Sequence, residues 1–110
     1  MNVIMYVVIF RAKTRETDEE YFIVANRMRE LAIEQFGCIE FAAVTEGNNE
    51  IALSYWPDEA SIRHWKSHAE HQIAQQLGRK HWYESYSVQV AQISREYCFP
   101  AKKASVEVGT

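Results

Sequence analysis

The segment near the start of the chain, VIMYVVIF at residues 3–10, is apolar at almost every position. Side chains of a strand point alternately to the two faces of its sheet, so a strand of this composition is stable only where both faces are covered. A chain of 110 residues forms one domain with few layers. Whatever fold it adopts must therefore bury both faces of the sheet that holds this strand.

The segment after this strand has the pattern of an amphipathic helix. Residues 17–20, Thr-Asp-Glu-Glu, fit a capping box in which the Thr17 hydroxyl accepts a hydrogen bond from the third helical amide. Gly37 is a suitable stop signal at the other end. Between these two signals, apolar residues recur at the three- and four-residue spacing of one helix face: Tyr21, Val24, Ala25, Met28, Leu31 and Ala32.

Two strands, a second helix and a last strand are predicted to follow. CIEFAAVTE at 38–46 and EIALSYW at 50–56 are strand-like, and the GNN between them is typical of a hairpin turn. Pro57, Asp58 and Glu59 begin a helix that should run to about Leu77 and end at Gly78. The last strand-like segment is YESYSVQVAQISREYCF at 83–99, whose alternation places three residues on one face: Tyr86, Val88 and Val90.

The order of these elements, β-α-β-β-α-β, predicts an α+β, ferredoxin-like fold with an antiparallel sheet and both helices on one face. The other face then has no cover within the chain, although the first strand requires it. A second copy of the protein is the simplest cover, because closed two-fold dimers are the commonest oligomers. We expect a homodimer of one domain at residues 1–99, with a polar C-terminal tail at 100–110.

Composition excludes several classes of partner. Twelve basic and fifteen acidic residues give a net charge of −3, without the basic patch of a nucleic-acid-binding protein. The apolar N-terminal segment lacks the flanks of a signal peptide and is shorter than the ~20 residues that span a bilayer, so we expect a cytoplasmic protein without a membrane partner.

Cys38 and Cys98 have no metal-binding spacing and are expected to be reduced thiols.

Residues 54–86 contain all four histidines, all three tryptophans and half of the tyrosines. His64, His68 and His71 have the i, i+4, i+7 spacing of one helix face, but three ligands from one straight helix rarely converge on a single ion, so no metal is predicted. Trp65 and His68 lie along one stripe of the same helix. If that stripe faces the sheet, it forms either ordinary core packing or one wall of a polar-aromatic pocket.

The element order and three segments resemble the antibiotic biosynthesis monooxygenase (ABM) domain of the dimeric α+β barrel superfamily, and within it the YqjZ-like uncharacterised bacterial proteins. The segments are SYW at the end of the third strand, the helix DEASIRHWKSHAEHQIAQ, and GRKHWYESY before the last strand. The resemblance covers about residues 3–98 and implies sheet-to-sheet dimers with a small-molecule pocket between sheet and helices. Family members catalyse several reactions, so the fold alone does not choose one.

The resemblance implies a cofactor-independent monooxygenase that oxidises a small aromatic metabolite, such as a phenol or quinol. In this hypothesis His68 or His71 is the acid/base, because the ordinary pKa of histidine, about 6.5, suits proton transfer near neutral pH. The resulting anion would reduce dioxygen directly, and no glycine-rich nucleotide motif indicates a flavin or nicotinamide. Five aromatic residues are expected to bind the substrate: Trp65, Tyr86, Tyr6, Trp82 and Tyr83.

Two alternatives remain open at this point. Haem-degrading members of the superfamily use an Asn on the first strand, a Trp on the second helix and a His nine or ten residues later. Trp65 matches, but the first strand has no Asn, and Ala74 and Gln75 occupy the histidine positions, so haem is disfavoured. In the second alternative the same pocket belongs to a non-catalytic dimer that binds or senses an aromatic metabolite.

Overall fold

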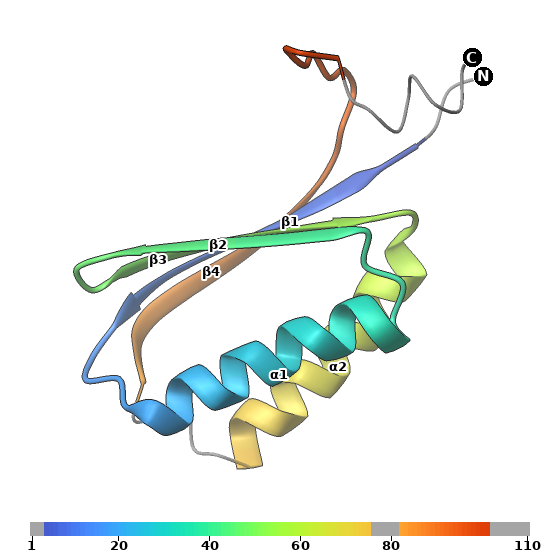
Figure 1. The fold of residues 1–110 in the computed structure, drawn as a ribbon. Coiled ribbons are helices and arrows are strands. Elements are labelled where there is room, and N and C mark those ends of the chain that lie inside the picture. The colour runs from blue at the N-terminus through green and yellow to red at the C-terminus, as the bar shows by residue number, and fades with distance from the viewer. Residues whose placement is uncertain (1–3, 76–81, 102–110) are drawn as a thin grey trace.

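The computed structural model describes residues 4–75 and 82–101, with the side chains of 4–69 and 82–101. The four strands form one antiparallel sheet in the order β2-β3-β1-β4, and both helices lie on the same face of it (Figure 1). This arrangement confirms the predicted ferredoxin-like α+β fold. The elements are β1 (Tyr6–Thr14), α1 (Glu19–Gln35), β2 (Glu40–Glu46), β3 (Asn49–Trp56), α2 (Glu59–Gln75) and β4 (Tyr83–Gln92).

Helix α1 has the predicted extent but a different cap. Asp18, not Thr17, is the N-cap residue, and its Oδ1 accepts a hydrogen bond of 2.9 Å from the amide of Tyr21. A carboxylate suits this position because it also interacts favourably with the positive end of the helix dipole. At the C-terminus the chain turns at Gly37, whose φ of 85° lies in the region that glycine adopts without strain.

The hairpin and the second helix also follow the local sequence. Gly47, with a φ of 60°, forms the turn between β2 and β3. At the start of α2 the Asp58 carboxylate accepts a hydrogen bond of 2.7 Å from the amide of Ser61. The helix is described as far as Gln75, so its predicted end near Leu77 and Gly78 lies outside the described residues.

Alternation along the strands separates two sets of side chains. On β1, Val8 and Ala12 are buried under the helices, whereas Val7 and Ile9, the two neighbours of Val8, point to the opposite face. Val8 is aligned with Ser54 on β3 and with Val90 on β4, so these neighbours share its face. The predicted grouping of Tyr86, Val88 and Val90 on one face is therefore confirmed, and that face is the one toward the helices.

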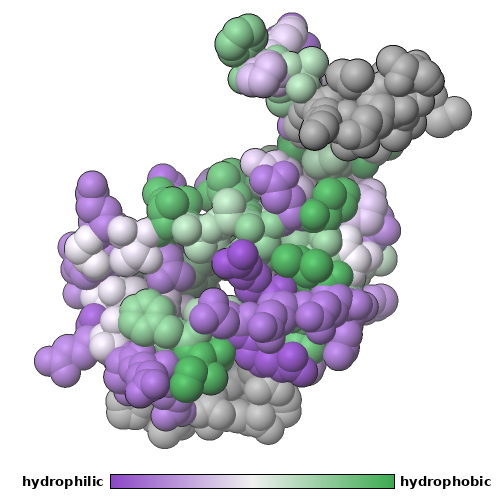
Figure 2. All heavy atoms as spheres, viewed as in Figure 1, coloured by the Kyte–Doolittle hydropathy of each residue, from purple (hydrophilic) through white to green (hydrophobic). Residues whose placement is uncertain are grey.

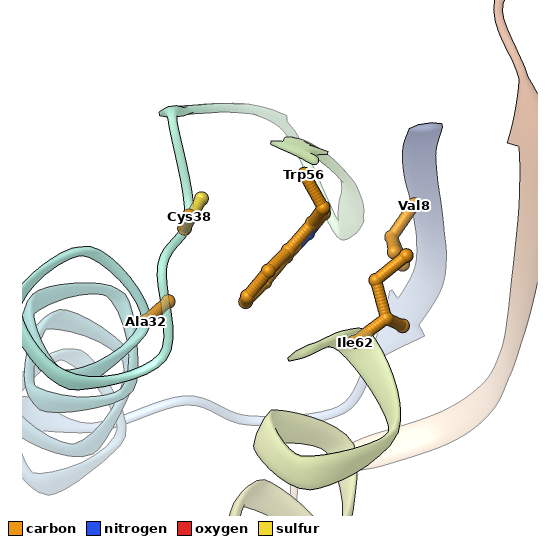
Figure 3. Packing of buried hydrophobic residues seen from close by; sticks show 5 residues of the cluster. All are labelled: Val8, Ala32, Cys38, Trp56 and Ile62. Atoms are coloured by element: carbon orange, nitrogen blue, oxygen red, sulfur yellow. The ribbon is translucent and has the colours of Figure 1, made fainter. Parts of the chain in front are cut away.

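Trp56, at the end of β3, is the centre of the main core cluster and is 0% exposed. Its indole ring lies between Ala32 and Cys38 on one side and Val8 and Ile62 on the other (Figure 3). The indole nitrogen donates a hydrogen bond of 2.8 Å to the hydroxyl of Ser54. One residue thus joins the sheet to both helices and satisfies its own polar group.

None of the described helices covers the second face of the sheet, because both lie on the other face (Figure 1). Ile51 and Val44, which are register partners on β3 and β2, are 41% and 67% exposed there. Figure 2 shows hydrophobic residues at the surface along the sheet, above a helix α1 whose outer side is mostly hydrophilic. The apolar pattern of β1 therefore corresponds to an uncovered sheet face, as the sequence predicted.

The last strand is shorter than the sequence indicates. β4 ends at Gln92, and the following residues leave the sheet and run away from the helices (Figure 1). Tyr97 and Phe99 in this segment are 85% and 101% exposed. Within the described residues, no helix is long and apolar enough to cross a membrane.

Candidate functional site

A cavity of about 290 Å³ lies between the sheet and the two helices. Its floor consists of helix-facing residues from all four strands, and its roof comes from one face of α1 and one face of α2. Small side chains create the space, because alanine occupies positions on both layers where larger residues would meet. These alanines are Ala43 and Ala52 on the sheet and Ala25 and Ala69 on the helices.

Aromatic rings form one end of the cavity, beside the start of α1. The rings of Tyr21 and Trp82 meet edge to face with centroids 5.3 Å apart, and Tyr21 meets Tyr83 in the same way at 6.0 Å. Tyr86 and Phe10 complete this wall, each within 6 Å of a neighbouring ring. The carbonyl of Trp82 accepts a hydrogen bond of 2.8 Å from the amide of Arg15, which fixes this wall to the end of β1.

Three polar side chains lie together at the same end: Tyr21, Glu50 and Tyr83. The Tyr21 hydroxyl donates a hydrogen bond to Oε1 of Glu50, and the ring of Tyr83 meets the ring of Tyr21 edge to face. Glu50 reaches this position because it shares the helix-facing side of β3 with Ala52 and Ser54. A carboxylate on the inner face of a sheet is uncommon, since burial of a charge requires a partner.

Burial controls the protonation of Tyr21 and Tyr83. Burial and the hydrogen bond with Glu50 raise the pKa of Tyr21 well above its usual range. Burial raises the pKa of Tyr83 to about 12, although the neighbouring Tyr21 opposes that change. Both residues are therefore neutral phenols near pH 7, and each has one proton to donate.

The other end of the cavity is closed by Trp65 and Ser54. The indole nitrogen of Trp65 donates a hydrogen bond of 3.1 Å to the carbonyl of Met28, so its ring joins α2 to α1. Trp65 can therefore offer a flat apolar surface to a ligand, but its N–H group is already used. The Ser54 hydroxyl accepts from Trp56 and keeps its own proton for another acceptor.

Four of the five predicted aromatic residues line the cavity: Trp65, Trp82, Tyr83 and Tyr86. The fifth, Tyr6, does not line it. Tyr6 is aligned with Trp56 on β3, beyond the end of the cavity floor, and packs against the core cluster.

Of the two predicted acid/base histidines, the structure describes the side chain of His68 only, and His68 does not line the cavity. His68 is one turn from Trp65 but is rotated about 60° around the helix axis, so its ring lies 5.5 Å from Phe36, beside the other helix. Nε2 of His68 is buried and has no hydrogen-bond partner among the described residues. His64 is exposed. The His71 side chain lies outside the described residues.

The cavity residues that were not predicted include Tyr21, Glu50 and Ser54. Tyr21 was assigned to the apolar face of α1, where it does pack, but its hydroxyl reaches Glu50. The sequence did contain a signal for the two strand residues. Every second residue of a strand faces the same side of the sheet, so Glu50, Ala52, Ser54 and Trp56 share a face. The two polar residues in that series lie on the side that the buried Trp56 identifies as interior.

Neither the cysteines nor a group of metal ligands adds a reactive centre to the described part of the cavity. Cys38 and Cys98 are free thiols, as predicted; the first is buried and the second exposed. Burial raises the pKa of the Cys38 thiol, so it is a poor nucleophile. No group of three metal-ligating side chains occurs among the residues that the structure describes.

Comparison with protein families matches residues 5–77 to the family described as "Antibiotic biosynthesis monooxygenase". The uncharacterised protein YqjZ of Bacillus subtilis is 42% identical over 95 residues, which cover 86% of this chain and 83% of that protein. A jasmonate monooxygenase of Pyricularia oryzae is 29% identical over 94 residues, covering 82% of this chain but only 44% of the fungal protein.

Among solved structures, a mutant of SnoaB, a cofactor-independent oxygenase from Streptomyces nogalater, has a similar fold. The TM-score is 0.62 at 14% sequence identity, and the match covers 87% of this chain and 97% of that one. At this identity the likeness concerns the fold. It agrees with the β-α-β-β-α-β order and the single four-stranded sheet.

Proposed function

The chain belongs to the antibiotic biosynthesis monooxygenase family, and we propose that it is a cofactor-independent monooxygenase for a small aromatic metabolite of the phenol or quinol type. The observation that supports this most is the cavity between the sheet and the helices, whose ends are aromatic. Trp65, Trp82 and Tyr86 offer ring surfaces for stacking on a flat molecule. SnoaB, which has a similar fold, is described as a cofactor-independent oxygenase.

The size of the cavity limits the substrate. Ligand pockets generally range from about 300 to 1,000 Å³, so a cavity of about 290 Å³ suits one or two fused rings rather than a large polycyclic molecule. The walls are mostly apolar, and an apolar site favours a reaction in which an electron-rich anion transfers an electron to dioxygen. The protein would bind the substrate, favour its deprotonated form and shield it.

The proposal leads to a direct assay. Purified protein should take up oxygen when supplied with a one- or two-ring hydroquinone or naphthol, and product should form in step with oxygen loss. Tryptophan fluorescence reports binding separately, because Trp65 and Trp82 line the cavity. His68→Ala is the matched control, since His68 lies outside the cavity, and it should keep at least half of the activity.

Each other outcome is informative. Binding without oxygen uptake across the substrate series would indicate a non-catalytic sensing protein. A loss of more than tenfold in kcat for His68→Ala, with KM unchanged, would restore histidine as the acid/base. The absence of both binding and oxygen uptake would contradict the proposal.

We also propose that the protein is a homodimer in which the uncovered sheet faces pack together. The face carries exposed apolar residues, including Ile51 and Val44, and a two-fold interface uses the same face twice. Light scattering should give twice the chain mass of 12.8 kDa. Ile51→Lys should raise the dimer dissociation constant at least a hundredfold, because each interface then buries two unpaired charges.

The control for this prediction is Ile23→Lys, which introduces the same charge at a position of α1 that is 60% exposed. It should leave the dimer intact. A monomeric wild-type protein at micromolar concentration would remove the dimer proposal.

A further inference from the structure

We propose that the Ser54 hydroxyl donates a hydrogen bond to an oxygen atom of the ligand, and that in a phenol or quinol substrate this is the oxygen that carries the negative charge. The recognition concerns binding alone, whereas the role toward the anion rests on the proposed function. The inference gives the ligand a defined feature, which is an oxygen that accepts a hydrogen bond at the end of the cavity closed by Trp65.

The direction of the hydrogen bond between Trp56 and Ser54 follows from the chemistry of indole. An indole N–H group donates and has no lone pair with which to accept. In this bond of 2.8 Å the serine oxygen must therefore accept, and the hydroxyl hydrogen of Ser54 takes no part in it. No group of the described residues accepts that hydrogen. Ser54 thus keeps one donor, and it lines the cavity.

The neighbours of Ser54 do not supply an acceptor. Ser54 is 3% exposed, and its register partners on β1 and β2 are Val8 and Phe41. The ring of Trp65 lies 6.2 Å from that of Phe41, and its N–H group donates to the carbonyl of Met28. A buried hydroxyl without a partner costs free energy. A ligand oxygen that accepts from Ser54 removes this cost, whereas a ligand without such an oxygen does not.

Other donors that line the cavity are less suited to this role. Arg29 and Lys66 are exposed, so water competes with a ligand for their hydrogen bonds. The hydroxyl of Tyr21 is buried, but it donates to Glu50. A hydrogen bond is stronger in surroundings of low dielectric than in water. Ser54 therefore offers a ligand a buried donor that no described residue has already taken.

The hydrogen bond from Trp56 prepares Ser54 for a charged acceptor. Trp56 is 0% exposed and is held within the core cluster of Figure 3. The two bonds run in one direction, from the indole to the hydroxyl and from the hydroxyl to the ligand, and bonds aligned in this way strengthen each other. A donor fixed in advance stabilises negative charge with little reorganisation. Ser54 keeps its own proton and favours the phenolate, while the proton of the phenol passes to the solvent.

Calorimetry with two probes of nearly the same shape, 1-indanone and indane, tests the recognition. The first has a carbonyl oxygen where the second has a methylene group, so only the first can accept from Ser54. Ser54→Ala should weaken the binding of 1-indanone at least about tenfold and change that of indane by less than about threefold. Ser54→Thr retains the hydroxyl and should restore the affinity for 1-indanone. Ser67→Ala deletes a hydroxyl from an exposed position of α2 and should change neither affinity.

A second pair of variants separates this role from the bond with Trp56. Ser54→Ala leaves the indole N–H without its acceptor, which weakens the fold and can affect both probes. In Trp56→Phe the indole is absent, so adding Ser54→Ala to that background removes only the hydroxyl. The selective loss for 1-indanone should appear there as well. An equal loss for both probes in that background, no loss in either background, or a wild-type protein that does not bind 1-indanone would overturn the inference.

The role toward the anion is tested with 1-naphthol, whose anion absorbs at longer wavelength than the neutral molecule. A pH titration of the bound probe should give an acid dissociation constant at least about tenfold smaller in Ser54→Ala than in the wild type, because the anion loses a donor. An unchanged constant would overturn this role and leave the recognition intact. If the wild type takes up no oxygen with any phenol, the proposed monooxygenase activity fails, and the two binding measurements still decide the inference.

Discussion

Replacing Trp56 with alanine should lower the free energy of unfolding by about 3–5 kcal/mol, the usual cost of truncating a fully buried aromatic residue. Trp56 is 0% exposed and packs against both helices and β1. The substitution leaves a cavity between Cys38 and Ile62 that neighbouring side chains fill only in part. It also removes the indole donor from the Ser54 hydroxyl. A single domain of this size is marginally stable, so the variant should be largely unfolded well below the melting temperature of the wild type.

Urea denaturation followed by circular dichroism measures this change. Ile33→Ala is the control, because Ile33 lies on α1 and is 45% exposed, and it should cost less than about 1 kcal/mol. Trp56→Phe should fall between the two, since it retains part of the ring volume. A cost for Trp56→Ala similar to that of Ile33→Ala would mean that the sheet and helices do not depend on this cluster.

The order and type of the elements could be predicted because each depends on local signals. Alternation along β4, glycine at 37 and 47, and acidic residues before both helices act over a few residues. The errors in these predictions were also local. Asp18 caps α1 in place of Thr17, since both residues can accept the same hydrogen bond and sequence alone does not decide which is one residue outside the helix.

The length of the last strand was not predictable in this way. The segment after Gln92 continues the β-rich composition, but β1, the strand that pairs with β4 among the described residues, begins at Tyr6 and pairs with Gln92 there. The length of a strand depends on the strand with which it pairs, so the sequence pattern of one segment does not predict it.

The aromatic part of the candidate site was predicted and its polar part was not. Trp65, Trp82, Tyr83 and Tyr86 lie within one concentrated stretch of sequence, so composition alone singled them out. The hydrogen bond from Tyr21 to Glu50 joins a helix and a strand that are 29 residues apart in sequence. Only the tertiary structure brings them together.

The position of His68 illustrates the opposite problem. Spacing places His68 near Trp65, but it does not fix which way the helix is turned about its axis. A rotation of about 60° moves a side chain from the cavity to the contact between helices. The imidazole of His68 is chemically suited to acid/base catalysis, but the orientation of the helix decides where this side chain lies.

Filling the cavity should have the largest effect on function. Ala52 lies in the middle of the floor, where it is aligned with Phe10 on β1 and Ala43 on β2. Ala52→Leu places three more carbon atoms in a space of about 290 Å³, so a flat ligand can no longer lie against the sheet. We expect affinity for 1-naphthol to fall by about 10- to 100-fold, equivalent to about 1.4–2.8 kcal/mol, and oxygen uptake to fall at least as far.

The fold should tolerate this substitution, because the added side chain enters an empty space instead of a packed one. Ala60→Leu makes the same change at an exposed position of α2 and should leave affinity and oxygen uptake within twofold of the wild type. Circular dichroism of both variants shows whether the structure is retained. Unchanged affinity in a folded Ala52→Leu protein would place the ligand outside this cavity, and the search would then move to the uncovered face of the sheet.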